Sequence, residues 1–330
     1  MDTGVILAVD GGASNCRALL CDCRGTVLSY AQGGACNYRN TGLDLAVSRL
    51  RDVVQAAIGG RVRLETAAFG LAGVDTRRDQ QLLTQSLQGM LREMGLVCDR
   101  VIVDNDGMMT LAGSLDQSSG VLLIAGTGAI ACGMTVAGEQ ARAGGWGHFL
   151  DAAGSGYAIG KAALQQSMRG YDGREPDSRL AAALLEHLEL ADPEQLVDWV
   201  YSSHFSVERV ASLAAVVAAF AAGGDSRAQA ILADAVRGLA AMAAAVVRRL
   251  RLQDRGFQLL LAGGLLQNLP DFRLQAAELI RNQYPCCRLQ ETQVPPICGT
   301  VLQAWRHRRI ERSQLLAALT RQLVSGQVQK

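Results

Sequence analysis

The feature that most constrains the fold is a pattern that occurs twice, once in each half of the chain. In each copy an apolar run leads into a glycine turn, and two further apolar runs follow with a tight turn between them. The first copy spans residues 5–31 and the second spans residues 121–143. Short apolar runs separated by glycine turns are typical of antiparallel strands. The pattern therefore predicts two three-stranded meanders that arose by duplication.

Helix-like segments such as 43–58 follow the meanders, and further buried strands such as 100–103 come after them. Such units predict two mixed α/β domains whose glycine turns face each other across a cleft. A length of 330 residues also favours two domains. We expect an N-terminal domain over 1–115 and a C-terminal domain over 116–330, because a polar stretch precedes the second meander. The last predicted helix, 314–323, is left open to pack back on the first domain.

The composition excludes several classes of partner. With 49% apolar residues, 19% charged residues and a formal charge of +1, the chain lacks the basic surface that nucleic acids and anionic membranes attract. The most apolar stretch, 211–222, is too short to span a bilayer, and the first apolar run is too short for a signal peptide. Nine scattered cysteines have no zinc or haem spacing. We therefore expect a cytoplasmic protein with reduced thiols and a small-molecule partner.

The first glycine turn combines groups that bind magnesium and phosphate. Asp10 ends the first apolar run, and Gly11, Gly12, Ser14 and Asn15 follow it. A carboxylate at a strand end can hold Mg²⁺ through water, and the backbone N–H groups of a glycine turn can reach a phosphate. An Asp-Gly pair in a hairpin is also common as a plain turn. The assignment gains its weight from two further turns.

These two turns complete a predicted ATP site. Gly126-Thr127-Gly128 occupies the equivalent place in the second meander and offers backbone donors and a hydroxyl to a polyphosphate from the other side. Gly263-Gly264 follows a third buried strand and lets a nucleoside lie against the backbone, where a Cβ would obstruct it. Neither a Walker A loop nor a dinucleotide fingerprint occurs in the sequence.

Asp106 is the candidate catalytic base. It follows the buried run at 101–103, at the C-terminal end of a strand, where open α/β sheets bind ligands. Transfer of a phosphoryl group to a hydroxyl needs a carboxylate within hydrogen-bond reach of the attacking oxygen. The structural alternative is that Asp104 or Asp106 caps a helix that starts near Gly107.

Motifs along nearly the whole chain resemble those of N-acetylglucosamine kinases of the BadF/BadG type, within the sugar kinase, Hsp70 and actin superfamily. The matching segments are VDGGASN at 9–15, GGACNYRN at 33–40, GLAGVD at 70–75, VDNDG at 103–107, IAGTGAIACG at 124–133, GGWGHFLDAAGSGY at 144–157, LAGG at 261–264 and PPICGT at 295–300. The resemblance implies an α/β fold with two ribonuclease H-like domains of the actin and hexokinase type. These domains would flank an ATP cleft, with ATP and Mg²⁺ as cofactors.

The resemblance also implies roles for single residues. Asp10 would assist Mg²⁺ in the first phosphate motif, Thr127 lies in the second, and Asp106 matches the catalytic base. Gly263 and Gly264 match the adenosine site.

Three positions match the pocket for the acetamido-sugar: Asn37, Gly145 and Trp146. An Asn amide both donates to and accepts from sugar hydroxyls, whereas core packing is the alternative for Trp146. The family's GDEGS stretch reads Asp151-Ala152-Ala153-Gly154-Ser155 here, so alanines replace its acidic pair. Asp151 stands where the family has glycine, and we expect it to take over the lost contact with the sugar.

The predicted function is ATP-dependent phosphorylation of an amino-sugar, N-acetylglucosamine or a close relative, at its 6-hydroxyl. One alternative is an ATP-driven activator of an acyl-CoA dehydratase or reductase, with an iron–sulfur cluster at a dimer interface, since Cys132 lies near a suitable strand. A sugar-binding regulatory protein with weakened catalysis is another, because of Ala152 and Ala153. The sequence is also compatible with a homodimer.

Overall fold

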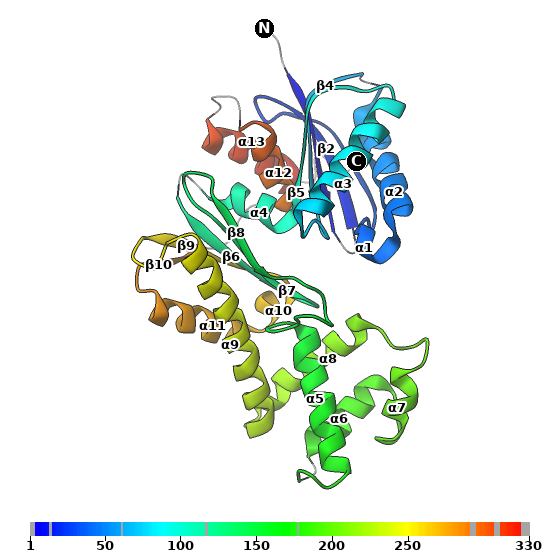
Figure 1. Cartoon of the computed structure of the whole chain (residues 1–330), viewed down its shortest axis with the longest axis vertical. Coiled ribbons are helices and arrows are strands. Elements are labelled where there is room, and N and C mark those ends of the chain that lie inside the picture. The colour runs from blue at the N-terminus through cyan, green and yellow to red at the C-terminus, as the bar shows by residue number, and fades with distance from the viewer. Residues whose placement is uncertain are drawn as a thin grey trace. The chain divides into compact units, whose positions relative to one another are not determined.

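The structure is a computed structural model that describes residues 4–12, 15–60, 62–115, 118–176, 178–290, 295–306 and 311–324. The chain divides into two compact units. Unit 1 takes Met1–Gln117 and Thr292–Lys330, and unit 2 takes Ser118–Glu291. Figure 1 shows the helices and strands of both units, coloured along the chain.

Unit 1 is built on a five-stranded mixed sheet with the strand order β3-β2-β1-β4-β5. β2 pairs antiparallel with β1 and with β3, whereas β4 lies parallel to β1 and to β5. The strands are β1 (Val5–Gly11), β2 (Asn15–Asp22), β3 (Val27–Gly34), β4 (Arg63–Leu71) and β5 (Val97–Asn105). The helices are α1 (Tyr38–Thr41), α2 (Leu43–Ile58), α3 (Arg77–Glu93), α4 (Asp106–Ser114), α12 (Pro296–Ala304) and α13 (Arg312–Val324).

Unit 2 repeats this architecture with the strand order β10-β9-β6-β7-β8. Its first three strands are antiparallel neighbours, and β9 lies parallel to β6 and to β10. The strands are β6 (Gly120–Ala125), β7 (Ala129–Met134), β8 (Gln140–Gly144), β9 (Phe257–Ala262) and β10 (Cys287–Gln290). The helices are α5 (Gly156–Tyr171), α6 (Arg179–Leu188), α7 (Gln195–Val200), α8 (Val207–Ala222), α9 (Ser226–Arg249), α10 (Gly264–Asn268) and α11 (Pro270–Gln283).

The two sheets correspond strand for strand in order and in direction. This correspondence confirms the two predicted three-stranded meanders. It also confirms the α/β fold class with two ribonuclease H-like domains, because each meander is extended by two parallel strands on the side of its first strand.

β1 is apolar from Val5 to Val9 because helices cover both faces of its sheet. Leu7 and Val9 point into a cluster that includes side chains of α2 and α3. Ile6 and Ala8 point the other way, into a cluster with α12 and α13. A central strand that is buried on both faces must be continuously apolar rather than alternating. The apolar run before the first glycine turn has this physical origin.

The structure divides the chain differently from the expected domains 1–115 and 116–330, because the C-terminal helices belong to unit 1. α12 packs on β1, β4 and α4. A Cβ added to Gly299 of α12 would lie 2.0 Å from the backbone oxygen of Met109 in α4. Leu315 and Leu319 of α13 join the same buried cluster. These helices cover the second face of the N-terminal sheet, which would otherwise expose its apolar side chains.

Within the described part of the chain, α9 is the one helix that is long and apolar enough to cross a membrane. However, 56% of its apolar window is buried inside the protein. Leu239, Ala243 and Val247 of this helix lie in the core of unit 2 with side chains of its sheet. The apolar character of α9 is therefore explained by its place in the core.

Candidate active site

In unit 1 the parallel strands β1, β4 and β5 end at one edge of the sheet. Asp10 of β1 pairs in register with Gly70 of β4, and Gly70 pairs with Asp104 of β5. α4 begins directly after β5, with Asp106 as its first residue. The sheet therefore brings two predicted site residues, Asp10 and Asp106, to the same edge.

Asn105 is the N-cap of α4, in place of Asp104 or Asp106, which were the alternative capping residues. The Oδ1 of Asp106 also accepts a hydrogen bond from the Gly107 N–H, at 2.8 Å. The Asn105 Oδ1 accepts a hydrogen bond from the backbone N–H of Gly107 at 2.9 Å. Its Nδ2 donates to the backbone oxygen of Val74 at 3.3 Å, which links the cap to the loop after β4. An Asn side chain at this position satisfies a helix N–H that has no partner within the helix. Sequence reasoning did not identify this residue, although Asn is among the preferred capping residues.

The electrostatic environment of Asp106 suits a general base. Burial and the negative charges of Asp10 and Asp75 together raise the pKa of Asp106 to about 6, against the lowering effect of the hydrogen bond from the Gly107 N–H. Burial also raises the pKa of Asp10, while Arg17, 3.4 Å from its Oδ2, opposes that rise. A carboxylate with a pKa near the working pH is ionised enough to accept a proton and basic enough to hold it.

The carboxylate oxygens of Asp10 fit a magnesium ion. The pKa of Asp10 is raised by burial, and a divalent cation would stabilise its ionised form. Among the residues that the structure describes, no group of three or more His, Cys, Asp or Glu side chains could hold a metal. Magnesium seldom needs such a cage, since it keeps several waters and takes one or two carboxylates together with phosphate oxygens.

In the first glycine turn, buried side chains pack tightly against Gly11. A Cβ on Gly11 would lie 2.4 Å from the Sγ of Cys36 and 2.6 Å from a methyl group of Leu71, so only glycine fits there. The N–H of Gly12 donates to the backbone oxygen of Asn15 at 2.8 Å and closes the turn. Asn15 is exposed at the start of β2. Ser14, a predicted phosphate-binding residue, lies outside the described residues.

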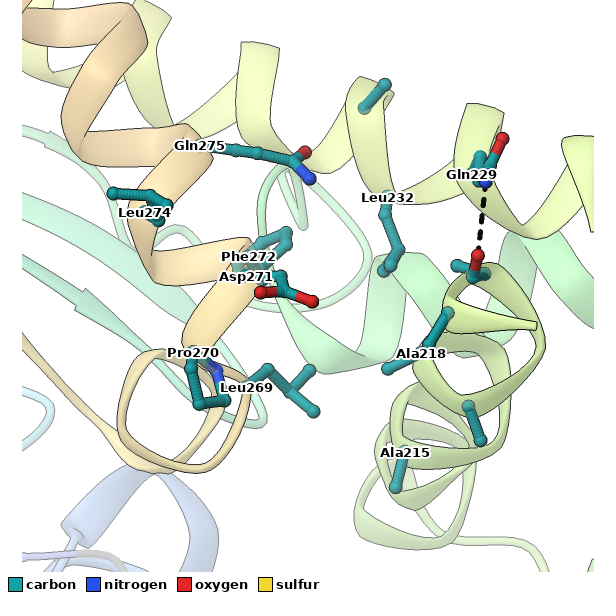
Figure 2. Close-up of a pocket in the computed structure, with 14 residues that line it drawn as sticks. Ala215, Ala218, Gln229, Leu232, Leu269, Pro270, Asp271, Phe272, Leu274 and Gln275 are labelled. Carbon is teal, nitrogen blue, oxygen red and sulfur yellow. Dashed lines mark hydrogen bonds between the residues drawn. The ribbon is translucent and has the colours of Figure 1, made fainter. Parts of the chain in front are cut away.

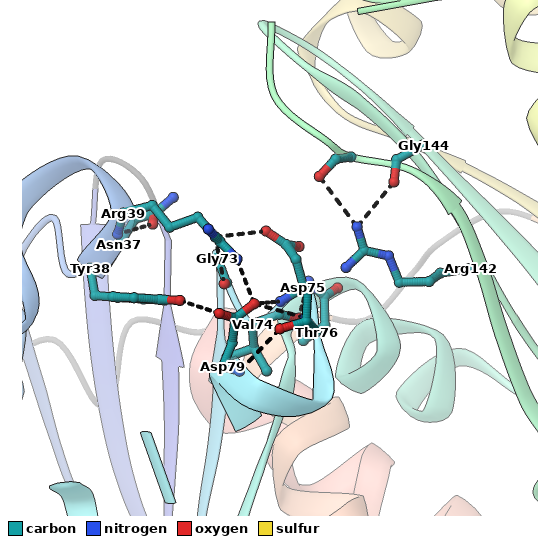
Figure 3. Close-up of polar contacts among 12 residues, drawn as sticks. Asn37, Tyr38, Arg39, Gly73, Val74, Asp75, Thr76, Asp79, Arg142 and Gly144 are labelled. Atoms are coloured by element: carbon teal, nitrogen blue, oxygen red, sulfur yellow. Dashed lines mark hydrogen bonds and ion pairs between the residues drawn. The ribbon is translucent and has the colours of Figure 1, made fainter. Parts of the chain in front are cut away.

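Asn37 is the N-cap of α1, close to the loop that follows β4. Its Oδ1 accepts a hydrogen bond from the backbone N–H of Arg39 at 3.0 Å. Gly73 has a φ of 91°, and a Cβ there would lie 2.5 Å from the Asn37 Oδ1. Figure 3 shows that Arg39 connects this corner to Asp75 and Asp79. The segment GLAGVD at 70–75 contains the signal for this network, but sequence reasoning assigned none of its residues a role.

In unit 2 the second glycine turn lies at the start of α5. The backbone oxygen of Gly126 accepts a hydrogen bond from the N–H of Gly156 at 2.8 Å, and that of Thr127 accepts one from Tyr157 at 3.3 Å. Thr127 and Gly128 are exposed. The turn therefore presents a hydroxyl and flexible backbone at the surface of unit 2.

The third glycine turn lies against the end of β6, next to the second turn. Gly263 has a φ of 93°, and a Cβ there would lie 2.4 Å from the backbone oxygen of Ala125. A Cβ on Gly126 would be 3.8 Å from the backbone nitrogen of Gly264. The structure thus brings together two of the three turns that sequence reasoning assigned to ATP.

A cavity of about 770 Å³ lies near the third turn, between α8, α9 and the segment from Leu269 into α11. Figure 2 shows the apolar side chains of Leu232, Phe272 and the α8 residues Ala215 and Ala218 around it, with Asp271, Gln229 and Gln275 as its polar residues. Gly264 begins α10, and the cavity-lining segment follows directly after α10. Sequence reasoning missed this cavity because its walls come from helices far apart in the chain.

The loop between β8 and α5 carries the other predicted sugar-binding residues. Gly145 has a φ of 70°, and its N–H donates to the backbone oxygen of Ala129 at 2.9 Å. Trp146 is 48% exposed, and the guanidinium of Arg142 lies 4.5 Å from the centre of its ring. Core packing, the alternative considered for Trp146, is therefore wrong. A half-exposed aromatic ring on a glycine-flanked loop suits stacking against a ligand.

Asp151 lies in the same loop and is held by it. Its N–H donates to the backbone oxygen of Gly147 at 3.1 Å, and its Oδ1 accepts a long hydrogen bond of 3.3 Å from the N–H of Ala153. A Cβ on Gly238 of α9 would lie 3.1 Å from the Cβ of Ala153, so the loop packs on that helix. The alanines that replace the family's acidic pair thus lie in a loop whose path is fixed by packing.

Searches against known proteins returned relatives that match nearly the whole chain. An N-acetylmuramic acid/N-acetylglucosamine kinase of Clostridium acetobutylicum is 29% identical over 91% of this chain and 97% of its own. An N-acetyl-D-glucosamine kinase of Dictyostelium discoideum is 27% identical over 92% of this chain and 98% of its own. A crystal structure from Chromobacterium violaceum, provisionally described as an N-acetylglucosamine kinase, superposes with a TM-score of 0.70 at 26% identity, covering 91% of this chain and 98% of that one.

These relatives confirm the resemblance to amino-sugar kinases and the assignment to the sugar kinase class of enzymes. The family model described as the BadF/BadG/BcrA/BcrD ATPase family matches residues 7–304. This match runs from β1 to the end of α12 and so includes the glycine turns of both units. The chain belongs to the BadF/BadG/BcrA/BcrD ATPase family.

Proposed function

We propose that the protein transfers the γ-phosphoryl group of ATP to the 6-hydroxyl of an amino-sugar, N-acetylglucosamine or a close relative, in the cytoplasm. The observation that supports this proposal is the position of Asp106 at the start of α4 together with its raised pKa. This residue is held at the start of α4 beside Asp10, and its pKa is raised to about 6. An ionised carboxylate of this kind takes the proton of the attacking hydroxyl as the bond to phosphorus forms.

Asp10 is the residue that we propose to hold Mg²⁺, largely through water. The ion, when bound, neutralises charge on the phosphate oxygens. Arg17 lies 3.4 Å from the Asp10 carboxylate and opposes the rise in its pKa that burial causes. The predicted phosphate-binding residues of unit 1 remain Gly11, Gly12, Ser14 and Asn15.

The nucleotide would bind unit 2 through its two adjacent glycine turns. Gly126, Thr127 and Gly128 would bind phosphate, since Thr127 and Gly128 are exposed. Gly263 and Gly264 would let the adenosine approach the backbone. We propose that the base enters the cavity of about 770 Å³ beyond α10, whose apolar helix faces suit a flat heteroaromatic ring.

Asn37 in unit 1 remains a proposed sugar-binding residue, as do Gly145, Trp146 and Asp151 in unit 2. The relatives named above support an amino-sugar, since their names specify N-acetylglucosamine. The exposed Trp146 ring offers an apolar face to the ring carbons of a sugar. The 6-hydroxyl is the expected acceptor because it is the primary and least hindered hydroxyl.

The iron–sulfur alternative is weakened by the position of its candidate ligand. Cys132 lies on β7 inside unit 2, with 0% of its surface exposed. A cluster shared between two subunits needs cysteines at the molecular surface. An iron assay on the purified protein tests this alternative, and a brown protein with stoichiometric iron would restore it.

The test of the proposed function is an ADP-release assay with a panel of amino-sugars, followed by NMR identification of the phosphorylated position. We expect turnover with N-acetylglucosamine or a close relative, and phosphate at the 6-position. Asp106→Asn should keep ATP and sugar binding while turnover falls by at least about a thousandfold. Sugar binding without turnover of any substrate would favour the alternative of a sugar-binding regulatory protein with weakened catalysis. Light scattering on the same sample determines whether the protein is the homodimer that the sequence allows.

A further inference from the structure

A second acidic residue, Asp75, lies close to the candidate base. It follows β4, which is the strand between β1 and β5. The segments that carry Asp10, Asp75 and Asp106 therefore leave the same edge of one sheet. The side chain of Asp75 is 16% exposed. Its negative charge acts on Asp106, where it contributes to the raised pKa.

Arg39 fixes the position of Asp75. The Arg39 Nε lies 3.2 Å from the Asp75 Oδ2 and donates to the backbone oxygen of Gly73 at 3.1 Å. Its Nη2 lies 2.5 Å from the Asp79 Oδ2 (Figure 3). One planar guanidinium that contacts three acceptors leaves little freedom to the loop between them.

Asp79 is a firm anchor for this arrangement. Its other carboxylate oxygen accepts a hydrogen bond of 2.5 Å from the Tyr38 hydroxyl, and it forms a capping box with Thr76 at the start of α3. Although burial raises the pKa of Asp79, the hydrogen bonds from Tyr38 and Thr76 lower it to about 2. Asp79 thus stays ionised and is already committed to the helix cap, whereas Asp75 is held at the edge of the sheet.

The same arginine also fixes Asn37. The backbone N–H of Arg39 donates to the Asn37 Oδ1 at 3.0 Å. A Cβ on Gly73 would lie 2.5 Å from that oxygen, so the two loops are in direct contact. A single residue therefore sets the spacing between Asn37, a predicted sugar-binding residue, and Asp75.

We propose that Asp75 is a further sugar-binding residue that accepts a hydrogen bond from a hydroxyl of the substrate ring, and that the guanidinium of Arg39 is the positioning group for Asp75. This proposal rests on the proposed function. A carboxylate can accept about four hydrogen bonds, so an ion pair with Arg39 does not by itself prevent Asp75 from accepting a substrate hydroxyl. A carboxylate that is held in place accepts a sugar hydroxyl more strongly than a neutral group does.

The test compares sugar and ATP kinetics in Asp75→Asn and Arg39→Met. We expect the KM for the sugar to rise roughly 10- to 100-fold in both, while the KM for ATP changes by less than about twofold. In the double variant, the KM for the sugar should rise by less than the product of the two single rises, because both substitutions act on one contact. The matched controls are Asp99→Asn and Arg63→Met, which break an exposed ion pair of unit 1 and should leave both KM values unchanged.

The pH dependence of turnover separates a role in the site from a structural one. The charged or titratable groups that act on Asp106 or border it include Asp10 with its partner Arg17, Asp75 with Arg39, and Cys36. Removing the charge of Asp75 should move the acid limb of the kcat profile to lower pH. Mere loosening of the fold would lower the melting temperature without moving that limb.

A folded Asp75→Asn enzyme with an unchanged sugar KM overturns the proposal. If Asp75→Asn does not fold, Asp75→Glu decides, since it keeps the charge but displaces the oxygens: a raised sugar KM supports the proposal and an unchanged one overturns it. Absence of kinase activity in the wild-type protein would instead contradict the proposed function itself.

Discussion

The side chain of Asn105 accepts a hydrogen bond from the N–H of Gly107 at 2.9 Å and so caps α4. This contact has a consequence for the residue between them. Asp106, the first residue of α4, has an Oδ1 that accepts the same N–H at 2.8 Å, and it lies at the same edge of the sheet as Asp10. Because Asn105 shares the capping of α4, we propose that the Asp106 carboxylate remains able to accept the proton of a substrate.

Asn105→Ala should destabilise the protein by about 1 kcal/mol, within the range of about 0.5–2 kcal/mol for lost helix caps. It should also lower kcat, because the first turn of α4 carries Asp106, the proposed catalytic base. Asn105→Ser keeps an oxygen acceptor and should recover most of the stability. Denaturant unfolding measures the first effect and the ADP-release assay the second. Equal stability of the Ala and Ser variants would contradict the capping role.

The pH profile of kcat/KM should show an acid limb near pH 6. Asp106 must be ionised to accept a proton, and its pKa in the free protein is raised to about 6 by burial and by Asp10 and Asp75. Below this value the rate should fall about tenfold per pH unit. Initial rates between pH 4.5 and 8.5, with the coupling enzymes in excess, provide the measurement. A limb near pH 4 would mean that the base is a carboxylate with an ordinary pKa.

The same pKa has a consequence for stability. The folded protein holds the Asp106 proton more tightly than the unfolded chain, whose Asp pKa is about 3.9. Stability is therefore lost as the pH rises from about 4 through about 6, and ionised Asp106 destabilises the fold above that. Asp106→Asn should be more stable than the wild type by about 1–3 kcal/mol at pH 7.5 and roughly equal to it at pH 4. Unfolding curves at the two pH values test the sign.

The meanders and their glycine turns could be predicted from the sequence because burial on both faces leaves a local signal. Ile6 through Val9 are all fully buried, so the strand reads as one apolar run. Gly11 has no room for a Cβ, which explains a glycine that is visible in the sequence. A local pattern also predicted the position of Asp106. An Asp that directly follows a buried strand can be recognised without knowing how the rest of the chain folds.

The features that were not predicted depend on contacts between distant segments. Gly299 packs against Met109, although nearly 200 residues separate them in the sequence. The packing of α12 on unit 1 therefore leaves no local pattern. Arg39, Asp75 and Asp79 read as ordinary surface charges until the two loops that carry them are brought together. The 48% exposure of Trp146 likewise became evident only from the structure.

The two glycines of the third turn should respond differently to alanine. In Gly263→Ala the new Cβ would meet the backbone of Ala125 at a φ of 93°, so we expect a loss of stability of at least about 2 kcal/mol and a higher KM for ATP. In Gly264→Ala the nearest atom is 3.8 Å away, so the fold should be unaffected. A raised KM for ATP in this second variant would identify close approach of the nucleotide, and unchanged kinetics would remove Gly264 from the ATP site.

Ala152→Asp should raise kcat/KM for N-acetylglucosamine by up to about tenfold, because it returns a carboxylate to the loop that we propose to contact the sugar. Ala152 is half-buried, and its backbone oxygen is held by the Ser155 hydroxyl at 2.6 Å, so the loop path should survive the change. Ala137→Asp adds the same charge to an exposed turn of unit 2 and should have no effect. If Ala152→Asp has no effect either, Asp151 already supplies the contact, and Asp151→Ala must then raise the KM for the sugar. Failure of both variants to change the sugar kinetics would mean that this loop does not select the substrate.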